Sequence, residues 1–368
     1  MNALPPIDFA RRRQAVVDAL ASDEHGCDAW LFDDLTDVRW LTGFTGSNGW
    51  AVVRGDELVL GTDLRYRERA AAETSDAGAT IVARQRAADL HQQLCEVLRG
   101  ADRVGLDAGR TSHAAWTALA AEIAVAARPS CVQLLRQIKD DAEIARIEAA
   151  AAATDAALAE VEPLLLGTAD SPVTEAEIRS ELEYRMRRHG ADDRSYDTIV
   201  ASGPSHAARP HHEASRRTIV EGDTVIIDVG ALVDGYHSDM TRSWVIGDAT
   251  AEQRELLELV AVAQRAGLDA TRHGVTARSI DDACRQVFDE AGRLDWYLHG
   301  TGHGVGLEIH ESPFHSQTSD DTVSAGMVVT VEPGLYRDGF GGFRIEDLVV
   351  VTETGHQVLT NSPQRPLN

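Results

Sequence analysis

The chain has 368 residues, 43% hydrophobic and 26% charged, a composition that fits a folded protein of two domains. It carries 59 acidic and 35 basic residues, so the formal net charge is −24, and a surface this acidic repels the phosphates of nucleic acids. No apolar run approaches the roughly 20 residues that a membrane helix requires, and none follows the basic N-terminal residues as in a secretory signal. We therefore expect neither a nucleic-acid partner nor a membrane partner.

The cysteines give no sign of a disulfide framework. Cys27, Cys95, Cys131 and Cys284 are far apart in the chain and include no CxxC pair. This spacing favours reduced thiols in a cytoplasmic protein.

The first third of the chain alternates helical and strand patterns, beginning with a predicted helix over residues 7–21. Residues 33–37 are predicted to form a turn, and Gly55-Asp56 separates two apolar runs as in a β-hairpin. Such alternation is typical of an α/β domain, which we place at residues 1–138. The other elements expected in it are helices at 64–73, 87–99 and 112–124 and strands at 80–84 and 103–107.

Residues 139–368 are predicted to form a second domain, in which a unit of helices followed by strands occurs twice. Its first helix covers residues 141–165, and Thr174 with Glu177 forms a capping box at the start of the next. Strands at 196–201, 223–231 and 236–246 complete the first unit. The second unit is expected to contain helices at 250–267 and 276–291 and strands at 296–299, 306–310, 327–333 and 343–351.

A glycine-rich segment from Gly300 to Glu311 contains the histidines His303 and His310 and a further glutamate, Glu308. Glycine permits positive φ angles and the close approach of a ligand, so a segment that keeps such polar side chains is a candidate site. A surface loop with incidental histidines is the alternative. Carboxylates elsewhere in the domain favour a site, to which the segment contributes its histidines, while Glu308 and Glu311 are expected to have structural roles.

The first carboxylate pair lies on a predicted hairpin. If that hairpin is centred between Val233 and Asp234, Asp228 and Asp239 face each other on adjacent strands. Like charges directly opposite each other are destabilising. A hairpin that keeps both carboxylates therefore needs water, a shared proton or a cation between them.

The second pair repeats this geometry, because a hairpin centred near Gly339 sets Glu332 opposite Glu346. Four carboxylates and one imidazole form an oxygen-rich ligand set that suits Mn²⁺, Co²⁺, Zn²⁺ or Fe²⁺ better than a structural thiolate zinc site. With both pairs around one cavity, two ions about 3.5–4 Å apart could share bridging carboxylates.

The candidate ligands are Asp228, Asp239, His303, Glu332 and Glu346. With their neighbours in the sequence, they resemble the metal site of the pita-bread metallopeptidases, the family of methionine aminopeptidase, aminopeptidase P and proline dipeptidase. The segments that carry the resemblance are Asp239-Met240-Thr241-Arg242, Gly302-His303-Gly304, His310-Glu311, Val331-Glu332-Pro333-Gly334 and Arg344-Ile345-Glu346-Asp347.

Residues 37–44, 62–66 and 196–203, with Pro210-His211, narrow the resemblance to the creatinase and proline-peptidase branch of the family. The resemblance implies an N-terminal α/β domain and a C-terminal pseudo-symmetric pita-bread domain, usually in a homodimer. It also implies two divalent metal ions per subunit, with Mn²⁺ as the first choice and Co²⁺, Zn²⁺ or Fe²⁺ as alternatives.

The resemblance assigns roles to further residues. A hydroxide bridging the two ions would attack the carbonyl group before proline, and Glu332 would be both a ligand and a general base or proton shuttle. His211 and His310 would stabilise the tetrahedral intermediate or position the substrate carbonyl, with His212 as the alternative to His211.

Two residues are expected on the substrate side of the pocket, each with a structural alternative. Arg344 either holds a substrate carboxylate or forms an ion pair with Glu346 or Asp347. His299 either lines the pocket or is a structural histidine. His206 is expected near the mouth of the pocket.

We therefore expect a cytoplasmic, dinuclear metallopeptidase that hydrolyses the Xaa-Pro bond of dipeptides or short peptides. An aminopeptidase P, which releases the N-terminal residue before proline, is the alternative, although the compact chain slightly favours a dipeptidase. A creatinase-like hydrolase that needs no metal and an inactive protein that binds peptides or protein partners are further alternatives. The complete set of metal ligands argues against both.

Overall fold

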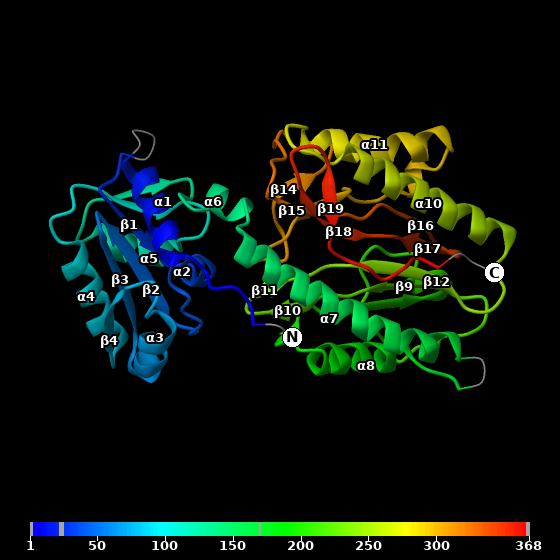
Figure 1. The fold of residues 1–368 in the computed structure, drawn as a ribbon, viewed down its shortest axis with the longest axis horizontal. Helices are drawn as coiled ribbons and strands as arrows, with labels where there is room; N and C mark the ends of the chain where they lie inside the picture. Colours follow the sequence, from blue (N-terminus) through cyan, green and yellow to red (C-terminus); the bar gives the residue numbers. More distant parts are fainter. Residues whose placement is uncertain (1–2, 22–25, 169–170, 366–368) are drawn as a thin grey trace. The chain divides into compact units, whose positions relative to one another are not determined.

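The computed structural model describes residues 3–21, 26–168 and 171–365, which divide into two compact units (Figure 1). One unit runs from Pro6 to Arg136, and the other comprises the residues up to Pro5 and those from Gln137 onward. The division lies close to the predicted boundary after residue 138. Among the described residues, no helix is both long and apolar enough to cross a membrane.

The N-terminal unit contains a six-stranded mixed sheet in the order β4-β3-β2-β1-β5-β6. The predicted hairpin is confirmed, since Arg54 pairs with Glu57 across Gly55-Asp56 and Gly55 has a φ of 53°. The strands are β1 (Ala29–Phe32), β2 (Gly49–Arg54), β3 (Glu57–Asp63), β4 (Thr80–Arg84), β5 (Val104–Asp107) and β6 (Val125–Arg128). The helices are α1 (Phe9–Ala21), α2 (Leu35–Thr42), α3 (Arg67–Glu73), α4 (Ala87–Leu98), α5 (His113–Ala120) and α6 (Gln133–Gln137), with a 3₁₀ turn at Leu64–Tyr66.

The predicted turn at residues 33–37 is wrong, because helix α2 already begins at Leu35. The Asp34 side chain accepts hydrogen bonds from the backbone N–H groups of Thr36 and Asp37, as an N-cap residue does. Aspartate favours turns and helix starts for the same reason, its ability to bond nearby backbone groups.

The first half of the C-terminal unit packs two helices, α7 (Asp141–Leu166) and α8 (Glu175–Arg188), against short sheets. Both helices begin with a capping box, and the one predicted at Thr174 and Glu177 is confirmed. Ile147 and Val161 of α7 are fully buried. The strands are β7 (Asp193–Arg194), β8 (Ile199–Ser202), β9 (Thr224–Asp228), β10 (Ala231–Val233), β11 (Tyr236–His237) and β12 (Thr241–Val245), and a short helix, α9 (Gly203–His206), follows β8.

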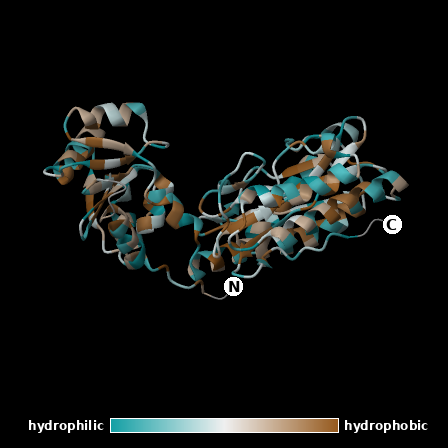
Figure 2. Cartoon of the chain, turned by 90° about the horizontal axis from the view of Figure 1, so that it is seen from above, coloured by the Kyte–Doolittle hydropathy of each residue, from teal (hydrophilic) through white to brown (hydrophobic). Residues whose placement is uncertain are grey.

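The second half repeats this plan with α10 (Ala251–Ala270) and α11 (Ala277–Glu290), which pack on a second apolar cluster. The strands lie between the helix pairs α7–α8 and α10–α11 (Figure 1), so the repeated unit is confirmed. Hydrophilic and hydrophobic residues alternate along these helices (Figure 2), as expected for helices with one buried face. The strands are β13 (Gly302–Gly304), β14 (Glu311–His315), β15 (Val328–Val331), β16 (Gly334–Arg337), β17 (Gly341–Arg344), β18 (Asp347–Val351) and β19 (His356–Val358).

The strands predicted at 296–299 and 306–310 are wrong. Leu294–Trp296 is a 3₁₀ turn, and the chain between β13 and β14 is irregular. The pairing of β13 with β14 shifts between His303 and Gly304, so the glycine-rich segment bends instead of extending. His303 therefore lies on the strand, and His310 lies at the end of the loop that follows it.

A buried ion pair joins the start of the C-terminal unit to this loop. The Lys139 ammonium group donates to the Glu311 carboxylate, and the two side chains are only 1% and 8% exposed. Removing one partner of such a pair leaves the other charge in a poorly hydrated place.

We predict that Lys139→Met lowers the free energy of unfolding by about 3–5 kcal/mol, the range typical of a broken buried pair. Urea unfolding followed by circular dichroism measures this loss. The matched control is Arg278→Met, which removes an exposed pair with Asp320 and should leave the unfolding midpoint unchanged. A loss below about 1 kcal/mol for Lys139→Met would show that the pair is replaceable.

Candidate active site

The first carboxylate pair lies on the hairpin of β9 to β12, but not in the predicted register. Asp228 pairs with Thr241, and Val233 pairs with Tyr236, so the turn is centred between Asp234 and Gly235. Asp234 and Gly235 have φ angles of 46° and 78°, as an Asp-Gly pair adopts in a tight hairpin turn.

The predicted alignment of Asp228 directly opposite Asp239 is therefore wrong. Asp239 precedes Thr241 by two positions, and residues two apart share a face of a strand. The two aspartates consequently converge along a diagonal, and together with Glu346 they bring three carboxylate oxygens within 4.8 Å of one another.

The second pair has the predicted register. Gly334 pairs with Arg344 in β16–β17, and Val331 pairs with Asp347 in β15–β18. Both pairings have the same register, which sets Glu332 opposite Glu346. Pro333 and Gly334 interrupt the strand, so the two glutamates lie where the backbone changes from one sheet to the other.

Asp239 and Glu346 are buried and Glu332 is half-buried, and this affects their protonation. Burial and the neighbouring negative charges raise the pKa values of Asp239 and Glu346 well above their ordinary range. Burial also raises the pKa of Glu332 to about 8. The Oε2 atom of Glu346 accepts a hydrogen bond from Thr241 at 2.8 Å, whereas its buried Oε1 has no hydrogen-bond partner among the described residues.

His303 adds a nitrogen to this group of oxygens. Its Nδ1 lies 3.0 Å from the carbonyl oxygen of Gly304, which fixes the proton on Nδ1 and leaves the lone pair on Nε2. Nε2 lies 3.5 Å from Asp239 Oδ2 and 3.4 Å from Glu332 Oε1. Burial lowers the pKa of His303 to about 4, so the ring is neutral at neutral pH.

This arrangement fits divalent metal ions. A neutral imidazole lone pair and several carboxylate oxygens converge, including the buried Oε1 of Glu346. Without a cation, protons must suppress the mutual repulsion of these groups. The donor atoms, mostly oxygen with one nitrogen, are those expected for Mn²⁺, Fe²⁺, Co²⁺ or Zn²⁺.

Tyr196 is a residue of the site that was not predicted from the sequence, and it contacts both Asp228 and Asp239. Its hydroxyl lies within hydrogen-bond distance of one oxygen of Asp228 and one oxygen of Asp239. Burial raises the pKa of the phenol well above its ordinary value, so it remains a donor. Tyr196 precedes Asp228 by 32 positions, so no local pattern in the sequence connects them.

Arg344 forms an ion pair with neither of the predicted partners. Its Nη2 atom donates to Asp228 Oδ2 at 2.6 Å, and its other hydrogen bonds go to Tyr336, Pro210 and Thr241. Asp347 pairs with Arg242 instead, at 2.7 Å. Arg344 is 2% exposed, and its guanidinium group connects the metal-binding side of the site to the loop that carries Pro210.

His299 belongs to the same hydrogen-bonded wall as Arg344. Its Nδ1 lies 2.7 Å from the carbonyl oxygen of Gly300, and its Nε2 lies 2.9 Å from the Tyr336 hydroxyl. Burial and the charge of Arg344 lower the pKa of His299 to about 4, so the neutral ring accepts a hydrogen bond from the Tyr336 hydroxyl at Nε2.

One cavity of about 850 Å³ brings the predicted site residues together. The ring of His310 packs edge-on against His303, with their centroids 4.4 Å apart. His206, predicted near the mouth, does not line the cavity and points to Glu175 instead. The predicted residues that line the cavity are Asp228, Asp239, His303, Glu332, Glu346, His211, His310, His299 and Arg344, and residues not predicted as part of the site include Tyr196, Ile309, Phe314 and His315.

Comparison with known proteins identifies related enzymes. The chain is 42% identical to an Xaa-Pro dipeptidase of Pyrococcus furiosus over 234 residues, which are 63% of this chain and 66%, just under two thirds, of that protein. Its structure resembles the Xaa-Pro dipeptidase from Bacillus anthracis with a TM-score of 0.91 and 34% identity, covering 98% of this chain and 99% of that one. It also resembles the X-Pro aminopeptidase from Thermotoga maritima with a TM-score of 0.87 and 31% identity, covering 98% of this chain and 99% of that one.

Family comparisons cover both units of the chain. Residues 12–138 match the creatinase/prolidase N-terminal domain, and residues 145–353 match metallopeptidase family M24. The latter match covers more than half of the chain and includes every carboxylate of the site. The chain therefore belongs to metallopeptidase family M24, whose members use divalent metal ions, and it carries a creatinase/prolidase N-terminal domain.

Proposed function

We propose that this metallopeptidase is an Xaa-Pro dipeptidase, which hydrolyses the bond before proline in dipeptides or short peptides. The observation that carries the proposal is the convergence of Asp228, Asp239 and Glu346 within 4.8 Å, beside the Nε2 atom of His303. The similarity to Xaa-Pro dipeptidases supports the choice of substrate.

We propose that Asp228, Asp239, His303, Glu332 and Glu346 hold two divalent ions. Such ions polarise the carbonyl group of the scissile bond and lower the pKa of the attacking water. Mn²⁺ is our first choice, and Co²⁺, Zn²⁺ and Fe²⁺ have the same ligand preferences here. The oxygen-rich donor set supports this choice.

The other residues of the cavity bind and orient the substrate or move protons. Glu332 lines the cavity and can accept the proton of the attacking water at a carboxylate oxygen and pass it to the leaving proline nitrogen. His310 and His211 line the same cavity and would donate hydrogen bonds to the carbonyl oxygen as negative charge develops on it.

Arg344 and His299 line the cavity and form one wall through their shared partner Tyr336. We propose that this wall shapes the subsite for the substrate. Four of the five N–H donors of Arg344 already bind Thr241, Pro210, Tyr336 and Asp228, so bidentate binding of a substrate carboxylate would require one of these contacts to open.

One observation favours aminopeptidase P as a second candidate. Among the described residues that line the cavity, Arg344 is the only arginine or lysine, and it is paired with Asp228. A dipeptide carries its carboxylate next to the scissile bond, so a cation in the cavity would help to bind it. A longer peptide has no carboxylate there. An arginine that is already paired with Asp228 therefore favours the longer peptide, which is the substrate of an aminopeptidase P.

Location and assembly are further parts of the proposal. We propose a cytoplasmic enzyme, which the four buried, unbridged cysteines support, because reduced thiols are usual in that compartment. A homodimer is expected from the family resemblance alone, and sedimentation of the purified protein tests it.

We predict that the purified enzyme contains about two transition-metal ions per chain and that EDTA abolishes Xaa-Pro cleavage until Mn²⁺ or Co²⁺ is added back. Asp239→Ala and Glu346→Ala should each abolish activity, because the remaining carboxylates cannot hold the second ion. Metal analysis and turnover are measured on the same samples. Glu353→Ala, at an exposed position of the same unit, is the control with unchanged activity.

The outcomes of this experiment separate the alternatives. Activity that resists EDTA would instead indicate a creatinase-like hydrolase. A folded protein that lacks metal and cleaves neither substrate with added Mn²⁺ or Co²⁺ would indicate an inactive peptide-binding protein.

Substrate length distinguishes the dipeptidase from the aminopeptidase. For a dipeptidase, kcat/KM for an Xaa-Pro dipeptide should exceed that for the matching Xaa-Pro-Yaa tripeptide by at least about tenfold, the ratio that corresponds to 1.4 kcal/mol of transition-state binding. Release of the N-terminal residue is measured for both peptides. A preference for the tripeptide would assign the enzyme to the aminopeptidase P type.

We predict that Tyr196→Phe weakens metal affinity about 10- to 100-fold, the usual effect of losing a hydrogen bond to a ligand. The phenol positions Asp228 and Asp239, and the change removes only its oxygen. Equilibrium dialysis against Mn²⁺ measures the affinity. Tyr184→Phe, at an exposed position, is the control. An unchanged affinity for Tyr196→Phe would rule out this orienting role.

A further inference from the structure

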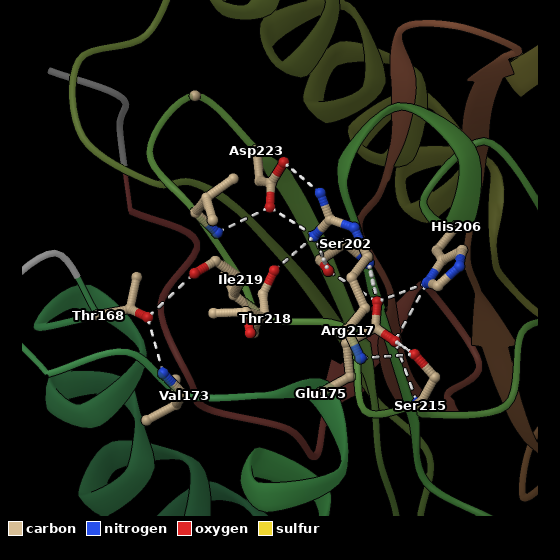
Figure 3. Close-up of polar contacts among 12 residues, drawn as sticks. Thr168, Val173, Glu175, Ser202, His206, Ser215, Arg217, Thr218, Ile219 and Asp223 are labelled. Carbon is tan, nitrogen blue, oxygen red and sulfur yellow. Dashed lines mark hydrogen bonds and ion pairs between the residues drawn. The ribbon is translucent and has the colours of Figure 1, made fainter.

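A buried carboxylate outside the cavity organises the loop that carries His211. Glu175 is the first residue of α8, and its side chain is fully buried (Figure 3). Its Oε1 accepts hydrogen bonds from the backbone N–H and hydroxyl of Ser202, at 2.8 and 2.7 Å, and lies 2.9 Å from His206 Nδ1. One oxygen of Glu175 therefore fixes the end of β8 and the helical turn α9.

The other oxygen fixes a segment that comes later in the chain. Oε2 accepts hydrogen bonds from the backbone N–H and hydroxyl of Ser215, at 3.1 and 2.6 Å (Figure 3). It also lies 3.4 Å from His212 Nε2. The first backbone N–H groups of α8 also donate to the carbonyl groups of Ser215 and Arg217. This segment is thus bound to the same helix start as Ser202.

Between these two anchored ends, residues 207–214 contain no helix or strand. This stretch places Pro210 and His211 on the wall of the cavity. Its backbone also reaches the metal-binding side of the site, because the carbonyl group of Pro210 accepts a hydrogen bond from Arg344, which pairs with Asp228. The position of His211 therefore depends on how the ends of the loop are held.

The two histidines beside Glu175 determine which way the loop faces. The rings of His206 and His212 stack with their centroids 3.9 Å apart. With His212 held against His206 and Glu175, the neighbouring His211 is directed to the cavity. The structure thus gives the two adjacent histidines different surroundings.

The hydrogen-bond donors around Glu175 stabilise its negatively charged form. Burial alone would raise its pKa, but the hydrogen bonds from Ser215, Ser202 and His206 lower it overall. The Ser202 hydroxyl accepts a hydrogen bond from Arg217, whose guanidinium pairs with Asp223 at 2.6 Å (Figure 3). A glutamate and two histidines could also bind a metal ion, but both oxygens of Glu175 already accept hydrogen bonds that an ion would have to displace.

We propose that Glu175 is a positioning residue, which holds both ends of the loop of residues 207–214 so that His211 faces the substrate. This inference rests on the proposed peptidase function and adds a residue that does not touch the cavity. Because His211 is expected to act on charge that develops in the transition state, displacing it should lower kcat more than it raises KM.

The test is steady-state kinetics of Glu175→Gln, which keeps the size of the side chain but removes its charge. We expect kcat for an Xaa-Pro substrate to fall about 10- to 100-fold, as for a misplaced catalytic group, with KM changed less than threefold, about 0.65 kcal/mol, and metal content unchanged. Glu177→Gln, two residues along the same helix, is the matched control, because glutamine preserves the capping box.

A double-mutant cycle separates positioning from general destabilisation. If Glu175 acts through His211, then Glu175→Gln in a His211→Ala background should lower kcat no further. Ser215→Ala is a milder change that removes one hydrogen bond to Glu175. It should lower kcat a few-fold in the wild type and no further in the His211→Ala background. If Glu175→Gln does not fold, this variant provides the test.

The results distinguish this inference from the proposed function. A wild-type enzyme that cleaves no Xaa-Pro peptide overturns the function, and the inference falls with it. If the wild type is active but the effects of Glu175→Gln and His211→Ala on kcat are additive, only the role of Glu175 is overturned. The same holds if the folded Glu175→Gln and Ser215→Ala variants keep wild-type kcat.

Discussion

Mutual repulsion among buried carboxylates is the constraint on which the C-terminal unit depends. Asp239 and Glu346 are almost fully buried, and Asp228 and Glu332 border the same cavity. Such a group is stable only if cations, protons or hydrogen-bond donors compensate its charge. The structure supplies donors at the edges, from Tyr196, Thr241 and Arg344, and we propose that divalent ions supply the remaining positive charge.

Two hairpins bring these carboxylates together, and their turns determine how they meet. The turn at Gly339, where φ is 78°, sets Glu332 opposite Glu346. The turn at Asp234-Gly235 instead sets Asp228 against Thr241, so Asp239 approaches along a diagonal. Thr241 then donates to Glu346, and this bond joins the two halves of the repeated fold. Thr241, which donates a hydrogen bond, thus lies opposite Asp228, where the like charge of Asp239 was expected.

The sequence predicts what depends on local patterns and misses what depends on distant contacts. The capping box at Thr174, the bounds of the long helices of the C-terminal unit and the register at Gly339 follow from neighbouring residues, so they were predicted correctly or to within three residues. Asp34 and the Asp-Gly turn were misread because short polar residues suit more than one local structure. The contacts of Tyr196 with Asp228 and of Glu175 with Ser215 join segments 32 and 40 positions apart, which no periodicity reveals.

In the proposed enzyme, divalent ions replace protons among these carboxylates. A crystal structure of the Mn²⁺-loaded protein with anomalous scattering data tests this. We expect two anomalous peaks about 3.5–4 Å apart, in contact with Asp228, Asp239, His303, Glu332 and Glu346. A Mn²⁺-saturated crystal with no anomalous peak among these five side chains would contradict it.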